Sequence, residues 1–162
     1  MVVNFFSSFP HWLGTLLMAM TPIGELRLSL PVAILAYKMP IWSALFWSVV
    51  GNMIPITIIL LFVDKFHRWI EKKSGFIASS WLKYLDRAQK KFDNKQYEKY
   101  GLLALAIFVG VPLPITGAWT GAVIAFLLAL PFKKAWIAIL AGVIMSATII
   151  LLVSLGANQI IN

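Results

Sequence analysis

Two long stretches without charge constrain this chain most. The 25 residues 39–63 carry no charged side chain, and neither do the 28 residues 135–162. A helix rises about 1.5 Å per residue and the hydrocarbon core of a bilayer is about 30 Å thick, so each stretch is long enough to cross it. Of all residues 60% are hydrophobic and only 12% are charged, about half the charged fraction of a soluble domain. The sequence therefore predicts an all-α integral membrane protein with two spanning helices.

Two further apolar stretches, residues 12–37 and 102–130, are interrupted by helix-breaking residues. Those residues are Pro22, Gly24 and Pro31 in the first stretch and Pro112, Pro114, Gly117 and Gly121 in the second. A proline removes a backbone N–H and clashes with the preceding turn, so neither stretch forms a continuous helix. Each remaining arm of about ten residues extends about 15 Å, which is half of the hydrocarbon core. We therefore expect two re-entrant helical hairpins, each with its break at the midplane.

Each hairpin precedes a spanning helix, which divides one membrane domain into two repeats, residues 12–63 and 101–158. Residues 1–11 contain several phenylalanines and are expected to lie at the membrane interface. An offset of 90 residues aligns Pro22 with Pro112. The halves enter the membrane from opposite sides, so we expect inverted-topology repeats, as in many secondary transporters whose broken helices meet at the midplane.

Basic residues concentrate between the two repeats. Residues 64–100 hold ten of the fourteen lysines and arginines, and the positive-inside rule places this linker in the cytoplasm. Its Trp81, Leu85, Ala88 and Phe92 recur at spacings of four, three and four, which predicts an amphipathic helix on the bilayer surface. The net charge of +8 is thereby explained by orientation and by attraction to anionic membrane lipids, so no nucleic-acid partner is expected.

Glu25 and Arg27 are the charges that stand inside an apolar stretch, between Pro22 and Pro31. Their separation of two residues does not bring them face to face on a helix, so we expect them to be splayed around a non-helical turn. A charge at the bilayer centre costs at least about 2.5–3.5 kcal/mol, which favours a transport pathway over a purely structural ion pair. A guanidinium suits a planar anion such as phosphate, and the carboxylate is a candidate proton carrier.

The second break offers uncharged partners for a ligand. Thr116 and Thr120 supply hydroxyl groups, and Trp119 lies beside the break, where it is expected to line a cavity. Asn52 in the first spanning helix is a further polar point, equally suited to a ligand contact or to a hydrogen bond between helices. The glycines of the second break either permit close approach of a ligand or let helices pack through small residues.

Other chemistries lack the residues that they need. There is no cysteine, the two histidines are isolated, and no pair of carboxylates lies in the apolar regions. Neither a glycine-rich phosphate loop nor a G-x-S-x-G nucleophile motif occurs. We therefore expect no metal site, no cofactor and no enzymatic activity.

The segment PIGELRLSLPVAI at 22–34, followed by VPLPITGAWTGAVIA at 111–125, resembles the bacterial and archaeal family of small multidrug export proteins, which is related to the DedA/VTT superfamily. The resemblance implies a multi-pass protein of a prokaryotic plasma membrane with two facing re-entrant hairpins. DedA-type relatives are implicated in moving lipid head groups or lipid phosphates across membranes, in dependence on the proton-motive force. An arginine typical of their second hairpin motif is missing here.

Three functions follow from these observations. The first is a secondary, proton-coupled translocase in which Arg27 binds an anionic lipid head group and Glu25 carries the proton. The second is a proton-coupled exporter of small amphipathic cations, in which Glu25 binds the substrate. The third is a non-transporting membrane scaffold, in which both charges only hold the hairpin turn. Because four apolar blocks bury little surface on their own, a homodimer is expected.

Overall fold

The computed structural model describes residues 6–71, 83, 95–113, 116–128 and 130–161. Within these residues every regular element is a helix, which confirms the predicted all-α class. The elements in chain order are α2 (His11–Met20), α3 (Glu25–Pro31), the π-helix η1 (Val32–Ala36), α4 (Ile41–Glu71), α6 (Lys95–Gly110), α7 (Ala118–Leu127) and α8 (Phe132–Ile161). The amphipathic helix expected around Trp81 lies outside the described residues.

Two of these helices are long and apolar enough to cross a membrane. In α4 the segment Ile41–Phe62 has 22 residues with a mean hydropathy of 2.1, and in α8 the segment Phe132–Gly156 has 25 residues with a mean hydropathy of 2.6. Large apolar side chains stand exposed on their outer faces, among them Ile58, Phe62 and Leu152. Exposed apolar surface of this extent fits a lipid environment, so both predicted spanning helices are confirmed in length and apolar character.

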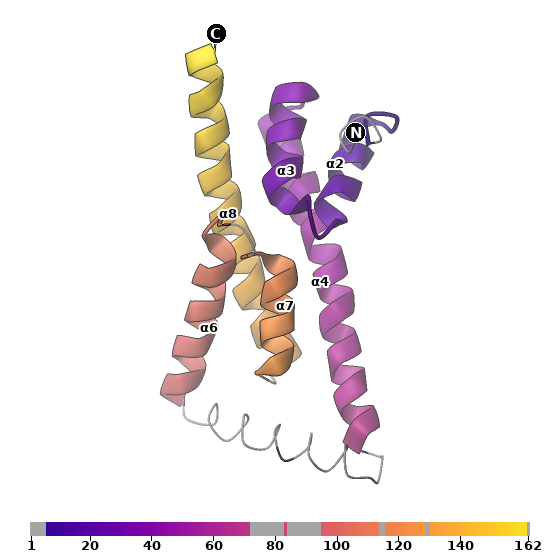
Figure 1. The fold of residues 1–162 in the computed structure, drawn as a ribbon, viewed down its shortest axis with the longest axis vertical. Coiled ribbons are helices and arrows are strands. Elements are labelled where there is room, and N and C mark those ends of the chain that lie inside the picture. The colour runs from indigo at the N-terminus through magenta and orange to yellow at the C-terminus, as the bar shows by residue number, and fades with distance from the viewer. Residues whose placement is uncertain (1–5, 72–82, 84–94, 114–115, 129, 162) are drawn as a thin grey trace.

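Each interrupted stretch forms two short helices joined by a turn. The helices α2 and α3 flank one turn, and α6 and α7 flank the other (Figure 1). The two turns point toward each other at about half the height of the molecule, between α4 and α8 (Figure 1). The helix α2 packs along α4, and α6 packs in the same way along α8. This arrangement brings residues 22–24 close to Pro112, Leu113 and Thr116, although about 90 positions separate them in the sequence.

Glycines let the first arm of each hairpin approach its long helix closely. A Cβ atom on Gly51 of α4 would collide with the carbonyl oxygen of Leu16 in α2. A Cβ atom on Gly142 of α8 would lie 2.5 Å from the carbonyl oxygen of Ala106 in α6. Helices that lack a side chain at the contact can bring their backbones together, as is common in membrane proteins. These two contacts therefore set how closely the first arm of each hairpin packs against its long helix.

Pro31 does not make the second break that the sequence predicts in the first hairpin. It lies at the end of α3, and the chain continues directly as the π-helix η1. The N–H of Tyr37 accordingly donates to the carbonyl of Val32, five residues earlier, at 3.0 Å. A wider turn accommodates the proline ring and its missing N–H without ending the helical segment, which explains why the sequence pattern misled here.

We predict that Gly51→Ala and Gly142→Ala each destabilise the protein, because each added methyl group meets backbone that cannot move aside. Overpacking of this kind costs about 1–3 kcal/mol. Thermal unfolding in detergent measures the effect. Gly156→Ala is the matched control, since a Cβ atom there meets nothing within 4 Å and alanine favours a helix. Equal melting temperatures for all three variants would contradict the proposed close contacts.

Candidate functional site

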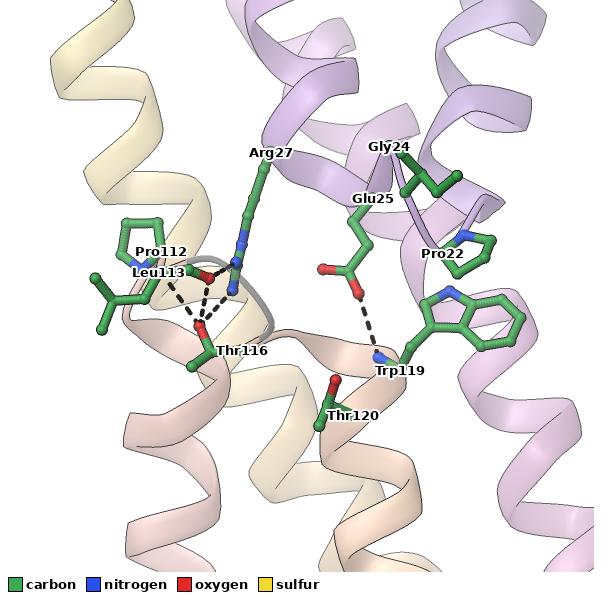
Figure 2. A pocket seen from close by; sticks show the side chains of 10 residues that line it. Pro22, Gly24, Glu25, Arg27, Pro112, Leu113, Thr116, Trp119 and Thr120 are labelled. Atoms are coloured by element: carbon green, nitrogen blue, oxygen red, sulfur yellow. Dashed lines mark hydrogen bonds between the residues drawn. The ribbon is translucent and has the colours of Figure 1, made fainter.

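A cavity of about 450 Å³ lies between the two facing turns (Figure 2). Its walls come from both hairpins and from no other part of the described chain. The lining residues are Pro22, Ile23, Gly24, Glu25 and Arg27 from the first hairpin, and Pro112, Leu113, Thr116, Trp119 and Thr120 from the second. The site therefore exists only while the two hairpin tips stay together.

The first turn holds Glu25 in an unusual backbone conformation. Thr21 ends α2 in an extended conformation, and its hydroxyl donates to the carbonyl of Met18 at 2.8 Å and accepts the N–H of Gly24 at 3.0 Å. The next residue, Glu25, has φ of 43°, in the left-handed region that residues with a side chain rarely adopt. Such a conformation costs about 1–3 kcal/mol and occurs preferentially at functional sites.

The Glu25 carboxylate lies at the N-terminus of α7. Its side chain is 8% exposed, and its Oε1 accepts the backbone N–H of Trp119 at 3.4 Å (Figure 2). The residue before α7, Gly117, touches the carboxylate so closely that a Cβ atom there would lie 2.6 Å from Oε1. No side chain of its own caps α7, and its first turn holds no acidic residue. Glu25 thus supplies from the other hairpin the negative charge that a helix N-terminus attracts.

Arg27 binds the opposite side of the same break. Its guanidinium donates to the carbonyl of Leu113 and to Thr116 Oγ1 at 3.0 Å (Figure 2). It also donates to the carbonyl of Val111 at 3.4 Å. These oxygens follow directly after α6, whose C-terminus carries the negative end of the helix dipole. The two charged side chains are splayed, as expected: Glu25 reaches the start of α7, and Arg27 reaches the end of α6.

Thr116 organises the loop that Arg27 binds. Its hydroxyl lies 2.8 Å from the carbonyl oxygens of both Val111 and Leu113 and 3.2 Å from the N–H of Leu113. A hydroxyl has one proton to donate and two lone pairs to accept with, so this one side chain serves several groups that the prolines leave without helical partners. The loop therefore presents its carbonyl oxygens in one place, toward Arg27.

The structure brings most predicted site residues together. Glu25, Arg27, Thr116, Trp119 and Thr120 all line the cavity. Asn52 does not: it is buried in α4, and among the described residues its Oδ1 has no hydrogen-bond partner.

The predicted break residues divide in a similar way. Pro22, Gly24, Pro112 and Gly117 lie at the turns, and Pro114 lies outside the described residues. Gly121 lies within α7, where a Cβ atom would come 2.5 Å from Cγ2 of Val109. Its role is therefore helix packing, the alternative that the small-residue spacing offered.

Ile23 and Leu113 are cavity residues that the sequence analysis missed. Both belong to the motifs of the two breaks, at positions between helix-breaking residues, where a turn exposes its side chains. That position in the turn was the available signal. The backbone carbonyls bound by Arg27 have no sequence signal, because every residue carries one.

The fold and the site define a helical membrane protein with a polar cavity between two hairpin tips. Residues 25–149 match the family described as "Putative small multi-drug export protein". The chain belongs to this family, and the match covers most of its length, from Glu25 at the first tip to α8. No match was found among the curated proteins or the solved structures.

We predict that Arg27 and Thr116 are energetically coupled. Each of Arg27→Ala and Thr116→Ala leaves backbone carbonyls without a donor, but together they remove the same set of bonds, so their effects are not additive. A coupling free energy of about 0.5–3 kcal/mol is expected from a double-mutant cycle of unfolding in detergent. Thr148→Ala is the control partner for Arg27→Ala, because the exposed Thr148 hydroxyl bonds only within its own helix, to Ile144. Additive effects in the Arg27–Thr116 cycle would rule out the shared network.

We also predict that Glu25→Gly is more stable than Glu25→Ala, because glycine adopts positive φ without steric cost. The difference is expected to be about 1 kcal/mol. At Leu28, within α3, the same pair of substitutions should give the opposite order, because alanine favours a helix. Unfolding of the four variants in detergent tests this. The same order at both positions would mean that Glu25 is not strained.

Proposed function

We propose that the protein exports small amphipathic cations in exchange for protons and that Glu25 is the shared binding group. The observation that carries this proposal is that the second hairpin binds the two charged side chains unequally. Arg27 donates to three oxygens of the second hairpin, whereas the hydrogen bond from Trp119 to Glu25 is 3.4 Å long. That distance exceeds the usual range of about 2.7–3.2 Å for an N–H···O bond, so the carboxylate is the charge that can exchange partners at low cost.

One carboxylate is enough to couple the two ions. A carboxylate that binds a monovalent cation carries no proton, and a protonated carboxyl group no longer attracts the cation. Occupancy of Glu25 is therefore exclusive, and exchange requires that the site reorients only while Glu25 carries a proton or a cation. Exclusive occupancy links outward movement of a cation to inward movement of a proton. The description of the family as export proteins accords with this direction.

The arrangement of the helices supports inverted-topology repeats and re-entrant hairpins. In the first half α2, α3 and α4 form a short, a short and a long helix, and in the second half α6, α7 and α8 repeat this order in the opposite direction (Figure 1). A Cβ atom on Gly51 would also lie 2.9 Å from Ala19, and one on Gly142 2.7 Å from Val109, at the same offset of 90 residues between the hairpin arms.

We place this fold as a multi-pass protein in a prokaryotic plasma membrane, with the basic linker in the cytoplasm. In such repeats substrates bind near the midplane, and one half rocks against the other to expose the site alternately. The homodimer expected from the sequence stays a prediction.

Translocation of an anionic lipid head group is the second candidate. It is favoured by two features of the cavity: Arg27 lies in its wall, and the N-terminus of α7 borders it where the Glu25 carboxylate lies. Both features attract anions, and a head group that displaced Glu25 would meet them together. The scaffold hypothesis uses the same contacts differently, as permanent links between hairpins. These alternatives predict different substrates or none, so one assay separates them.

The assay is flux in proteoliposomes with and without a pH gradient. The substrates are a fluorescent lipophilic cation, a fluorescent anionic phospholipid and a polyprenyl phosphate. We expect cation movement that the pH gradient accelerates and that Glu25→Gln lowers at least about tenfold, the effect of about 1.4 kcal/mol. Glu71→Gln, at the last residue of α4, is the matched control and should leave flux unchanged. Lipid movement that depends on Arg27 would favour the second candidate. A folded protein that moves none of the three substrates would favour the scaffold hypothesis.

Cation binding to the purified protein should weaken as the pH falls. A proton and a cation compete for one carboxylate, so affinity drops about tenfold per pH unit once Glu25 is mostly protonated. Titration of a fluorescent cation at several pH values measures this. In Glu25→Gln the residual binding should be weak and independent of pH. A wild-type affinity that does not change with pH would exclude Glu25 as the shared group.

A further inference from the structure

We infer that the cavity opens sideways into the hydrocarbon core of the bilayer, through a mouth formed by Ile23 and Leu113. A substrate would reach Glu25 from the lipid, with its charged group inside the cavity and its apolar part still in hydrocarbon. This inference rests on the proposed export function and adds the class of substrate: lipophilic cations that already partition into the membrane, rather than small hydrophilic ones.

The exposure of these two residues is the first support. Ile23 is 93% exposed and Leu113 is 55% exposed, although both line the cavity that contains the buried Glu25. Each comes from a different hairpin tip, so the mouth lies where the two tips meet. Turns that face water usually carry Gly, Asn, Asp and Ser at their exposed positions. Large aliphatic side chains at both tips point instead to an apolar surrounding.

The depth of the tips is the second support. Helices α2 and α7 have ten residues each, about 15 Å of helix; α2 ends at the first tip and α7 begins at the second. That length is half of a hydrocarbon core of about 30 Å. The long helices α4 and α8 continue past the tips in both directions (Figure 1). A residue that is exposed at this depth meets acyl chains rather than water, unless protein covers it.

Polarity changes steeply from the mouth inward. The apolar side chains of Ile23 and Leu113 stand at the rim, whereas the Glu25 carboxylate is 8% exposed and lies against Trp119. The volume of about 450 Å³ falls in the range of pockets for small organic ligands. An amphipathic cation satisfies both regions at once. A hydrated cation such as methylammonium would have to lose its water in hydrocarbon before it reached the carboxylate.

Spin-label accessibility tests the mouth without relying on transport. The chain has no cysteine, so Ile23→Cys and Leu113→Cys each carry one nitroxide label in reconstituted vesicles. Oxygen concentrates in hydrocarbon, whereas a nickel chelate stays in water. Ile144→Cys, on the exposed face of α8, is the lipid standard, and Lys133→Cys, near the start of α8, is the aqueous standard.

We expect the ratio of oxygen to nickel accessibility at Ile23 and Leu113 to equal that at Ile144 and to exceed that at Lys133 about tenfold, because the polar chelate is excluded from hydrocarbon. Ratios that match Lys133 would overturn the inference and show that the tips face an aqueous vestibule. Low accessibility to both reagents would also overturn it and show that protein, such as a second copy, covers the mouth.

Flux measurements then test the class of substrate. Wild-type protein should move tetraphenylphosphonium at least about tenfold faster than methylammonium, and Ile23→Trp, which narrows the mouth, should slow tetraphenylphosphonium at least about fivefold. Ile137→Trp on the exposed face of α8 is the matched control and should have no effect. If the labels report a lipid-facing mouth but no cation moves, the proposed export function is contradicted and the inference about the mouth is not. Equal flux of both cations would mean that the export function stands while access from lipid fails.

Discussion

The contact between two charges of the first hairpin and the two broken ends of the second is the interaction on which the site depends. The end of α6 leaves carbonyl groups without helical donors, and the start of α7 leaves N–H groups without acceptors. In a bilayer no water is present to satisfy them, and each unsatisfied group costs several kcal/mol. Arg27 and Glu25 satisfy one end each. Two charges and two open helix ends would each be costly to bury alone, and together they offset each other.

The contact between Glu25 and α7 affects how the two hairpin tips could move apart. Glu25 holds the start of α7 and would also, under the proposed function, hold the proton or the substrate. Binding of either one weakens its contact with Trp119 and therefore the link between the hairpin tips. Arg27 has no such second task, because its partners are all oxygens of one loop. Under the proposed function one side of the break therefore stays closed while the other opens, as a site with alternating access requires.

The sequence predicts the elements of this fold better than their contacts. Charge-free length and proline position are local properties, so the spanning helices and both interruptions could be located from residues alone. The partners of Arg27 could not, because backbone carbonyls look alike in every sequence. The π-helix after Pro31 could not be predicted because its five residues, Val32–Ala36, are all apolar and show no periodicity that would mark a wider turn. Asn52 was assigned to the site by its polarity, but the face on which a lone polar residue lies depends on packing that the sequence does not specify.

In the two hairpin tips the polar groups face inward and large apolar side chains face outward, unlike in a turn that faces water. In water a turn can leave its backbone to solvent and carries polar side chains outward. Here the backbone groups are taken up by Arg27, Glu25 and Thr116 on the inside, and the outward side chains are Ile23 and Leu113. Polar inside and apolar outside is the arrangement that lipid imposes on any protein segment exposed to it. The tips follow this rule even though they are turns, and a polar cavity bounded by an apolar rim is the direct result.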